Sequence, residues 1–413
     1  MTNNQRWRPG KRVAIIGAGP GGVSAALSLV QQGYDVRIFE RWNDPRPLGG
    51  GVLLSVPVLA VLRHYGIDIN QFGSFTRTEF RNHRGKLRCQ VKFNPEIERR
   101  LGIPGWHYGV LRASAFQRML NRLQALDADV ITGGMRFTRY EEQGEEVVVH
   151  FDNHEHVVCD LLIGADGIHS QVSRQAFGDP QLFHTGLRLW LAWCGDVPGI
   201  PKNLGRIHHS ARIQASFFPM LHDGQPGFEW WVVEPQPKDA PAPSDPREHV
   251  RRLLADFVEP MPRFLEHTDF ERNCFIWDIH NRPSLDRYTQ GRIACVGDAV
   301  HPVSPYAAYG MGMAIEDGYF LTRTLAGRDL RDPQVVASAT ARYNEDRVAF
   351  CNHNVEFARM LGDQFHRASP GKAWLRDLVF DHTPLLQKMI DKGGMEETEK
   401  TTLQLRELHM ATG

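Results

Sequence analysis

The chain has 413 residues, with 48 Lys and Arg balanced by 48 Asp and Glu, so its formal net charge at pH 7 is zero. This balance gives no support for nucleic acid or an anionic membrane as a partner. Its six cysteines include no Cys-x-x-Cys pair, which argues against metal and dithiol redox sites and favours a cytoplasmic protein.

The first expected element is a short apolar strand, Arg12 to Ile16, that runs into a glycine-rich turn from Gly17 to Gly22. A helix rich in Ala, Leu and Val follows, and a second strand ends at Glu40. In such a βαβ unit the Gly-x-Gly-x-x-Gly spacing lets a pyrophosphate approach the backbone, and the acid binds ribose hydroxyls. The unit predicts an ADP-containing dinucleotide; the alternative is a glycine-rich turn with an acid placed by chance.

Residues 13–30 superficially resemble a signal peptide, but four glycines and a proline followed by a strand fit a βα unit better. No other apolar run approaches the ~18 residues of a membrane span, so we expect none. Because the glycine motif occurs once, we expect one dinucleotide to be held permanently. A second glycine run, Gly49 to Gly51, predicts either close approach to a ligand or a flexible loop.

Residues 75–93 alternate polar and apolar around Arg84-Gly85, which predicts a hairpin. Apolar residues at helical spacing follow to residue 126. Arg112 stands at the start of this expected helix, where it would be either a surface charge or a contact to the dinucleotide. Residues 135–158 predict two or three short antiparallel strands. A buried strand then ends in Gly164-Ala165-Asp166-Gly167, an acid-glycine turn.

Residues 180–283 predict an antiparallel sheet domain inserted into the dinucleotide domain, with a helix over 246–258. Five of the nine tryptophans of the chain lie here, at positions 190, 193, 230, 231 and 277. Their faces would suit a flat substrate, or they could form the core of the sheet itself. The candidate substrate contacts are Trp190, Phe217 and Trp230, together with Tyr306 further along the chain.

Residues 291–321 predict a strand from Ile293 to Val296, the turn Gly297-Asp298, a loop, and a helix from about Ala314. This pattern suits a flavin, because Asp298 can bind a hydroxylated chain and the loop can face the ring edge that becomes negative on reduction. Beyond it, helices are expected over 335–361, 373–380 and 385–390, with a polar end that is either frayed or wrapped on the surface.

The order of three motifs, GxGxxG with a distal acid, GADG and GDAVHP, resembles the single-component (class A) FAD monooxygenases of the p-hydroxybenzoate-hydroxylase type. The segment ASFFPMLHDGQPGFEWWVVEP is similar to the substrate-domain hairpin of the salicylate-hydroxylase-like branch. The resemblance implies an α/β fold: a Rossmann-like FAD-binding domain with an inserted antiparallel-sheet substrate domain and a helical C-terminus. The FAD-binding parts would be 1–75, 105–178 and 285–360, the substrate parts 76–104 and 179–284, and the helical end 361–413.

The resemblance also implies roles for individual residues. Glu40 would bind the adenosine ribose, Arg112 and Asp166 would contact the cofactor, and Asp298 would bind the ribityl chain. The full set of implied cofactor contacts is Gly17, Ala18, Gly19, Pro20, Gly22, Glu40, Arg41, Arg112, Asp166, Asp298, Pro305, Gly310, Met311 and Gly312. Relatives usually read Pro-x-x-Gly-x-Gly-x-Asn at the flavin loop. This chain has Ala308 in place of the first glycine and Gly312 in place of the asparagine, so we expect a differently shaped loop.

The implied reaction is hydroxylation of an aromatic or heteroaromatic small molecule through a C4a-hydroperoxyflavin, with FAD held tightly but not covalently and NAD(P)H and O2 consumed. Residues that could serve as a base are His107, Tyr108, His208, His209 and Tyr306, and none is assigned. Rival interpretations are a reductase or halogenase of the same fold, although the halogenase stretch Trp-x-Trp-x-Ile-Pro is absent, and a non-catalytic FAD-binding scaffold. The oligomeric state is expected to be a monomer or homodimer, with no metal.

Overall fold

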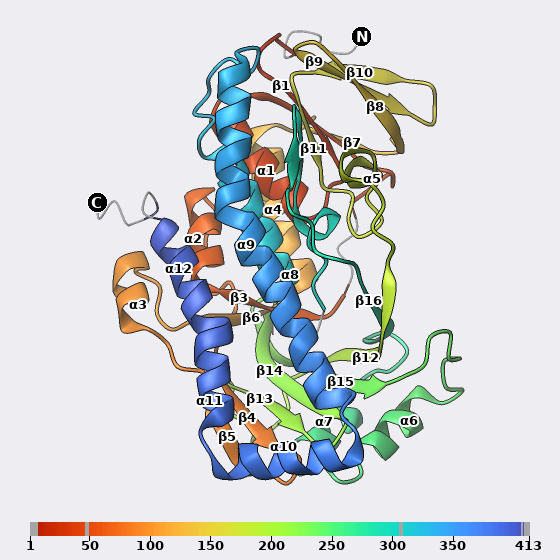
Figure 1. Cartoon of the computed structure of the whole chain (residues 1–413). Helices are drawn as coiled ribbons and strands as arrows, with labels where there is room; N and C mark the ends of the chain where they lie inside the picture. Colours follow the sequence, from red (N-terminus) through yellow and green to blue (C-terminus); the bar gives the residue numbers. More distant parts are fainter. Residues whose placement is uncertain (1–6, 46–48, 305–308, 406–407, 409–413) are drawn as a thin grey trace.

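The computed structural model describes residues 7–45, 49–304, 309–405 and 408. The molecule is elongated, with a parallel sheet at one end, a large mainly antiparallel sheet at the other, and one long helix running between them (Figure 1). The described helices include none that is both long and apolar enough to cross a membrane.

The parallel sheet is built on β1, whose sequence RVAII is buried throughout, as expected for a strand covered on both faces. Its strand order is β17-β18-β11-β1-β2-β7, and all neighbours pair in parallel except β17 with β18. The strands are β1 (Arg12–Ile16), β2 (Asp35–Phe39), β7 (Ile131–Thr132), β11 (Leu161–Gly164), β17 (Thr289–Gln290) and β18 (Ile293–Cys295). The predicted βαβ unit is therefore confirmed.

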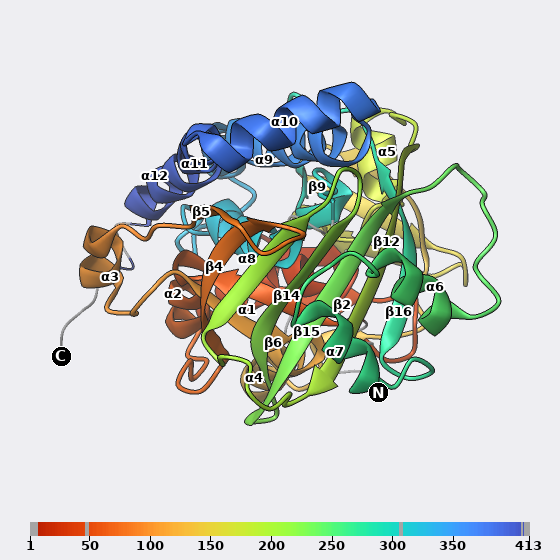
Figure 2. The ribbon, with the colours of Figure 1, turned by 90° about the horizontal axis from the view of Figure 1, so that it is seen from below.

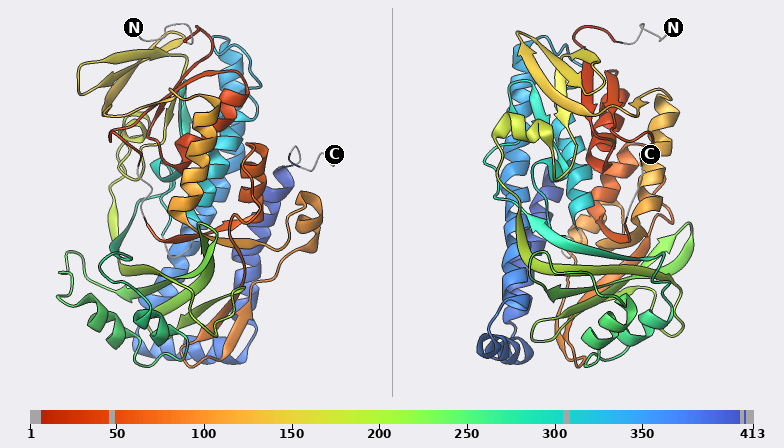
Figure 3. Two further views of the ribbon diagram at one scale, coloured as in Figure 1. Left: turned by 180° about the vertical axis from the view of Figure 1, so that it is seen from behind. Right: turned by 90° about the vertical axis from the view of Figure 1, so that its right-hand side faces the viewer.

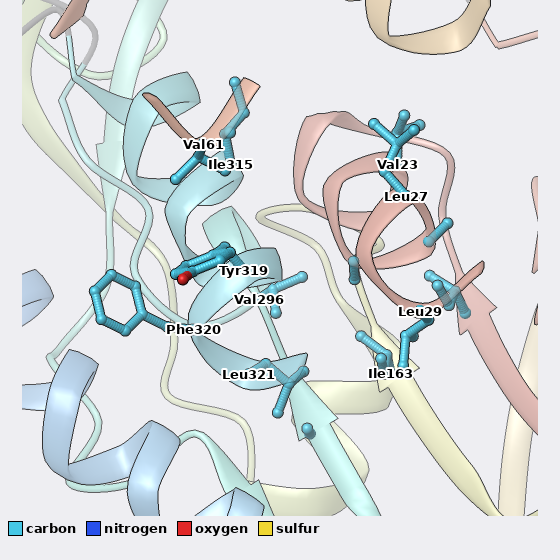
Figure 4. Packing of buried hydrophobic residues seen from close by; sticks show 14 of the residues in the cluster. Val23, Leu27, Leu29, Val61, Ile163, Val296, Ile315, Tyr319, Phe320 and Leu321 are labelled. Carbon is cyan, nitrogen blue, oxygen red and sulfur yellow. The ribbon is translucent and has the colours of Figure 1, made fainter. Parts of the chain in front are cut away.

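Two helices bring their N-termini to the same end of this sheet, α1 (Pro20–Gln31) and α8 (Gly310–Thr322). They pack closely because Gly318 of α8 has no side chain, and a Cβ there would lie 2.5 Å from the backbone nitrogen of Ala25. Ser24 also donates a hydrogen bond to the carbonyl of Ile315 at 2.6 Å. Figure 4 shows the apolar side chains that fill the surroundings of this helix pair.

Residues 137–159 form a separate three-stranded antiparallel sheet, which confirms the prediction for this segment. Its strands are β8 (Phe137–Gln143), β9 (Glu146–Phe151) and β10 (His156–Cys159). The helix α4 (Arg112–Leu126) precedes it and α5 (Gln171–Phe177) follows β11.

The large sheet has nine strands and takes in residues 51–111 as well as 183–281. Its order is β16-β12-β15-β14-β13-β4-β6-β3, with β5 beside β4. The strands are β3 (Gly51–Ser55), β4 (Ser74–Asn82), β5 (Leu87–Gln90), β6 (His107–Leu111), β12 (Phe183–Gly195), β13 (Leu204–His209), β14 (Gln214–His222), β15 (Gln225–Pro235) and β16 (Cys274–Asn281). The predicted hairpin at Arg84-Gly85 is β4 and β5.

Each face of the large sheet has a different cover. The short helices α6 (Pro246–Leu253) and α7 (Met261–Glu266) lie on the face turned away from the parallel sheet (Figures 2 and 3). The opposite face is turned toward α8 and the parallel sheet. The helices α2 (Val56–His64) and α3 (Pro95–Leu101) lie beside its β3–β6 edge.

The C-terminal part is helical, as predicted, but it extends further. It comprises α9 (Pro333–His366), α10 (Pro370–His382), α11 (Leu385–Ile390), a π-helical turn (Asp391–Met395) and α12 (Glu396–Gln404). Of the two alternatives for the polar end, the frayed one is wrong as far as Leu405, because α12 is helical and Thr401, Thr402 and Leu405 are buried. The start of α8 was also misplaced, since it begins at Gly310 and not near Ala314.

Candidate functional site

Three adjoining cavities run from the end of the parallel sheet to the space between the large sheet and α9. The nucleotide cavity, of about 680 Å³, is bounded by the glycine turn, Glu40 and Asp166. The central cavity, of about 290 Å³, is bounded by Asp298, the start of α8 and the glycine run at 49–51. The apolar cavity, of about 200 Å³, lies between the large sheet and α9.

The cavities adjoin through shared residues. Gly19, Pro20 and Arg112 line both the nucleotide and the central cavity. The central and apolar cavities share Trp231, Val303 and Tyr309. An extended ligand could therefore run from Glu40 to the start of α8, with a second molecule next to its far end.

The glycine turn is shaped by contacts that leave no room for side chains. Gly17 has φ +100°, and a Cβ there would lie 2.4 Å from the carbonyl oxygen of Ala165. A Cβ on Gly22 would lie 2.2 Å from the carbonyl oxygen of Gly17. At Gly19 the only neighbour is the oxygen of Ala165 at 3.9 Å, so its backbone is open to the cavities.

The N-terminus of α1 lies at this open backbone. Gly19 is its N-cap, and no side chain caps the first turn. Uncapped N–H groups and the helix dipole favour an anionic group here. The cradle thus fits a pyrophosphate, while Gly22 serves helix packing and does not line either cavity.

Glu40 is held at the end of β2 by two backbone donors. Its carboxylate accepts hydrogen bonds from the N–H of Ala18 at 2.9 Å and of Trp42 at 3.1 Å. The guanidinium of Arg41 lies over the ring of Trp42, 5.5 Å from its centre. Glu40 and Arg41 line the nucleotide cavity, where oxygen lone pairs remain for ribose hydroxyls.

Asp166 lines the nucleotide cavity, but its carboxylate is already engaged. One oxygen accepts from the hydroxyl of Ser170, and the other from the N–H of Gln171 at 2.7 Å. Burial raises the pKa of Asp166, although these hydrogen bonds oppose the shift. The side chain therefore caps α5, and its contact with a cofactor stays a prediction.

Asp298, in the turn before α8, and Arg112, at the start of α4, both line the central cavity. The Asp298 side chain is exposed to the cavity, and among the described residues no hydrogen bond to it is found. Burial raises its pKa, while His301 and Arg112 act to lower it. A carboxylate placed this way can accept hydrogen bonds from a polyhydroxyl chain.

The glycine run lines the central cavity, and a buried acid lies behind it. The N–H of Gly51 donates to Oε2 of Glu229 at 2.6 Å, and a Cβ on Gly50 would lie 2.3 Å from Oε1 of that acid. Burial raises the pKa of Glu229 well above its ordinary value, which favours the uncharged form of this group. The glycine run therefore packs closely against Glu229, and its close approach to a ligand stays a prediction. Glu229 was not among the predicted site residues, although one acid inside an apolar strand was a signal for it.

Of the cofactor contacts implied at the flavin loop, some line the central cavity and others do not. Gly310 and Met311 line the central cavity. Gly312 is not among the residues that line it, and its Cβ position faces Val58 of α2 at 3.1 Å, so a contact of its backbone with the flavin stays a prediction. Pro305, Tyr306 and Ala308 lie outside the described residues.

The acids Glu316 and Asp317 belong to α8 and form part of a buried polar network. They lie in the middle of α8, fully buried, and both pair with Arg347 of α9, through Oε2 at 3.0 Å and Oδ1 at 2.8 Å. Asp317 also bonds His301, and Glu316 accepts the hydroxyl of Tyr309 at 2.9 Å. Burial would raise the pKa of Asp317, but His301 and Arg347 lower it to about 2. We call these five residues the α8–α9 polar cluster.

A possible metal group overlaps this cluster. Ligand atoms of His301, Asp317 and Cys351 lie within 4.8 Å of one another. The carboxylate of Asp317 is already neutralised by Arg347 and His301, so the group is explained as an ion-pair network.

The substrate contacts predicted on the large sheet lie on the face turned away from the central cavity, so that prediction is wrong. Trp190, Phe217 and Trp230 are buried in the core between the sheet and α6 and α7. Trp190 donates to Glu234 and Trp230 to Thr268, each at 2.8 Å. Because side chains alternate along a strand, their neighbours are the ones that line the central cavity: Leu189, Leu191, Phe218 and Trp231.

Two of the candidate bases reach the apolar cavity, His107 and His209. His208 packs near Phe217, and the hydroxyl of Tyr108 donates to the carbonyl of Pro104. Burial lowers the pKa of His107 to about 4 and that of His209 well below its ordinary value. Both rings are therefore neutral near pH 7, in a cavity that is otherwise mainly apolar and aromatic.

Comparisons with known proteins agree with these features. The family model described as FAD binding domain matches residues 11–358. The chain is 27% identical over 343 residues to 6-hydroxynicotinate 3-monooxygenase of Pseudomonas fluorescens, covering 76% of this chain and 82% of that protein. It is 27% identical over 389 residues to 3-amino-4-hydroxybenzoate 2-monooxygenase PtmB3 of Streptomyces platensis, covering 91% and 93%.

The fold is also that of a solved flavoprotein. Klebsiella pneumoniae HpxO, solved with FAD and uric acid, superposes with a TM-score of 0.79 at 24% identity, over 97% of this chain and 99% of that one. The glycine cradle, the open Asp298 and the two helix N-termini fit FAD in its extended form. The chain therefore belongs to the FAD-binding-domain family, and it is an FAD-dependent monooxygenase.

Proposed function

We propose that this enzyme hydroxylates a small aromatic or heteroaromatic molecule held in the apolar cavity, using NAD(P)H and O2. The observation that carries the proposal is the wall shared by the central and apolar cavities, formed by Trp231, Val303 and Tyr309. A flat molecule in the apolar cavity would lie directly beside the flavin ring in the central cavity. Hydroxylation needs that proximity, and apolar walls exclude water.

FAD would be held along the first two cavities. The pyrophosphate would lie at Gly19 and the start of α1, the adenosine ribose at Glu40, and the ribityl chain at Asp298. The full proposed set is Gly17, Ala18, Gly19, Pro20, Glu40, Arg41, Arg112, Asp166, Asp298, Gly310 and Met311. Bound FAD supplies the redox chemistry, taking electrons from NAD(P)H and activating O2.

The residues of the chain contribute binding and electrostatics. The N-terminus of α8 has no side-chain cap and points its positive end at the central cavity, where it stabilises negative charge. Tyr309 is the N-cap of this helix, and its hydroxyl is fixed by Glu316. It therefore forms a rigid wall between the two cavities, which keeps a substrate ring at a defined distance from the flavin.

NAD(P)H would bind transiently, since the sequence has one glycine motif and Gly19 and Glu40 belong to FAD. The choice between NADH and NADPH is decided by comparing the two as reductants. A cytoplasmic location and a monomeric or homodimeric state belong to the same proposal, and sedimentation of the FAD-loaded protein measures the state.

A cavity-filling pair tests the function. Leu361 of α9 lines the apolar cavity, whereas the neighbouring Met360 is 38% exposed. Leu361→Trp should keep FAD but lose substrate-stimulated NAD(P)H oxidation and oxygen-18 incorporation from labelled O2. Met360→Trp should keep both. Equal activity of the two variants on every compound that stimulates the parent enzyme would count against the apolar cavity.

A further inference from the structure

The described walls of the apolar cavity carry no formal charge. None of its described lining residues is Lys, Arg, Asp or Glu. Its polar side chains are Thr78, Trp106, His107, His209, Gln214, Trp231, Tyr309 and Asn354. All of these can form hydrogen bonds, but a charged ligand would find no counter-ion among them.

The two histidines do not supply a charge either. His209 is 2% exposed and stacks on Phe365, with ring centres 3.8 Å apart. Its Nε2 lies 3.1 Å from Oε1 of Gln214, which accepts, so the neutral ring carries its proton on Nε2 and Nδ1 is an acceptor. Protonating either imidazole would place a cation among apolar side chains, and burial accordingly lowers the pKa of His107 to about 4.

The positive charges of two arginines near His209 are compensated by ion pairs. Arg88 and Arg376 disfavour a charge on His209, but neither lines the cavity. Arg88 pairs with Asp381 at 2.6 Å and with Asp377 at 3.0 Å, and Arg376 pairs with Asp377 at 2.7 Å. These ion pairs leave little positive potential to attract an anion into the cavity.

We infer that the substrate is an uncharged hydroxy- or amino-substituted ring, and that the cavity discriminates against the same ring carrying a carboxylate. The inference rests on the proposed function, because it takes the apolar cavity as the substrate site. Burying an ionised carboxylate without a partner is strongly unfavourable, whereas a hydroxyl or amino group can donate to a neutral imidazole nitrogen. The names of the two relatives above give substrates that carry a carboxylate, so the substrate class would differ from theirs.

Binding measured without NAD(P)H tests the inference separately from turnover. Three probes are titrated into the FAD-loaded enzyme and followed by the flavin difference spectrum: 6-hydroxynicotinate, its amide 6-hydroxynicotinamide, and 2-hydroxypyridine. A second pair is 3-amino-4-hydroxybenzoate and 2-aminophenol. The uncharged members should bind at least about tenfold more tightly than the carboxylates. The amide matters most, because it has the size of the carboxylate without the charge.

A variant of the cavity should shift its preference toward the ring that carries a carboxylate. Asn354 lines the cavity from α9 and hydrogen-bonds only to the carbonyl of Phe350 among the described residues. Asn354→Arg should raise the affinity for 6-hydroxynicotinate relative to its amide by at least about tenfold, because it adds a bidentate partner for the carboxylate. Met360→Arg adds the same charge on the exposed side of α9 and should change nothing.

The outcomes distinguish this inference from the proposed function. Carboxylates that bind as tightly as their uncharged partners, or no binding of any of the five probes, would overturn the inference. Tighter binding of uncharged rings supports it even if no hydroxylated product forms, a result that would instead sink the proposed function. Hydroxylation confined to the carboxylates would leave the function standing and refute the substrate class.

Discussion

Arg347 of α9 donates from Nε to Oδ1 of Asp317 in α8 at 2.8 Å, and both side chains are fully buried. The same carboxylate accepts the N–H of Gly297 at 2.8 Å, next to Asp298. One ion pair thus joins the long C-terminal helix, the helix that starts at the flavin loop and the turn that carries Asp298. The α8–α9 polar cluster therefore holds in place the turn and the helix that line the central cavity.

Removing Arg347 should be costly. Arg347→Met leaves the carboxylates of Glu316 and Asp317 buried without a cation, so we expect a loss of about 3–5 kcal/mol in the free energy of unfolding. Arg367→Met, at the C-cap of the same helix, breaks a pair whose side chains are 59% and 58% exposed and should cost no more than about 1 kcal/mol. Urea unfolding of the two variants checks this, and equal losses would show that the buried pair is not what joins the helices.

Asp298 should be a cofactor ligand rather than a structural residue. Asp298→Ala should weaken FAD binding about 10- to 100-fold, since a hydrogen bond to a charged group is worth roughly 1.5–3 kcal/mol. The apoprotein should not lose stability, because a carboxylate whose pKa is raised by burial has been removed. Titration of the apoprotein with FAD measures the affinity. Asp286→Ala, at an exposed position on the same segment, is the control and should bind FAD normally.

The glycines of the turn should fail in different ways. Gly17→Ala combines a positive φ with a clash against Ala165, so we expect the fold itself to lose about 1–3 kcal/mol or more. Gly19→Ala meets no clash and should fold normally, yet its methyl group lies where the pyrophosphate would bind, so FAD affinity should fall. Thermal unfolding of the apoprotein and FAD titration separate the effects. Gly371→Ala in α10 has open space around it and should alter neither.

Acid should destabilise the protein through buried histidines. Burial lowers the pKa values of His107, His208 and His366 to about 4, from an ordinary value near 6.5. Between these values the unfolded chain binds protons that the folded chain does not, so stability is complete above about pH 6.5 and falls as the pH drops toward 4. Each histidine contributes at most about 1.4 kcal/mol per pH unit.

Urea midpoints between pH 7.5 and 4.5 measure this loss. His366→Gln should reduce the slope, and His267→Gln, at an exposed position, should leave it unchanged. A midpoint that does not fall between pH 6.5 and 4.5 would mean that these rings are not buried in neutral form.

The local parts of the site could be predicted from the sequence because each depends on neighbouring residues. The turn from Gly17 to Gly22, the acid at Glu40 and the turn at Asp298 follow directly from short strands and glycine spacing. The start of α8 was placed four residues too late, because Gly310 and Gly312 are poor helix formers and tertiary packing against α1 and α2 overrides that preference.

The face of the large sheet could not be predicted in the same way. Residues 227–234 of β15 are buried on both sides, so apolar and aromatic residues do not alternate with polar ones, and the pattern gives no sign of which tryptophan meets the flavin. The roles of Glu316 and Asp317 were equally hidden. Their partner Arg347 lies 30 residues away on another helix, and only the folded chain brings it to them.

The most direct test is a crystal structure of the FAD-loaded enzyme with 2-hydroxypyridine. We expect the flavin ring in the central cavity between Asp298 and the start of α8, with the pyridine ring in the apolar cavity beside Trp231, Tyr309 and His107. A pyridine ring bound elsewhere, or a flavin whose ring does not reach the wall formed by Trp231, Val303 and Tyr309, would contradict it.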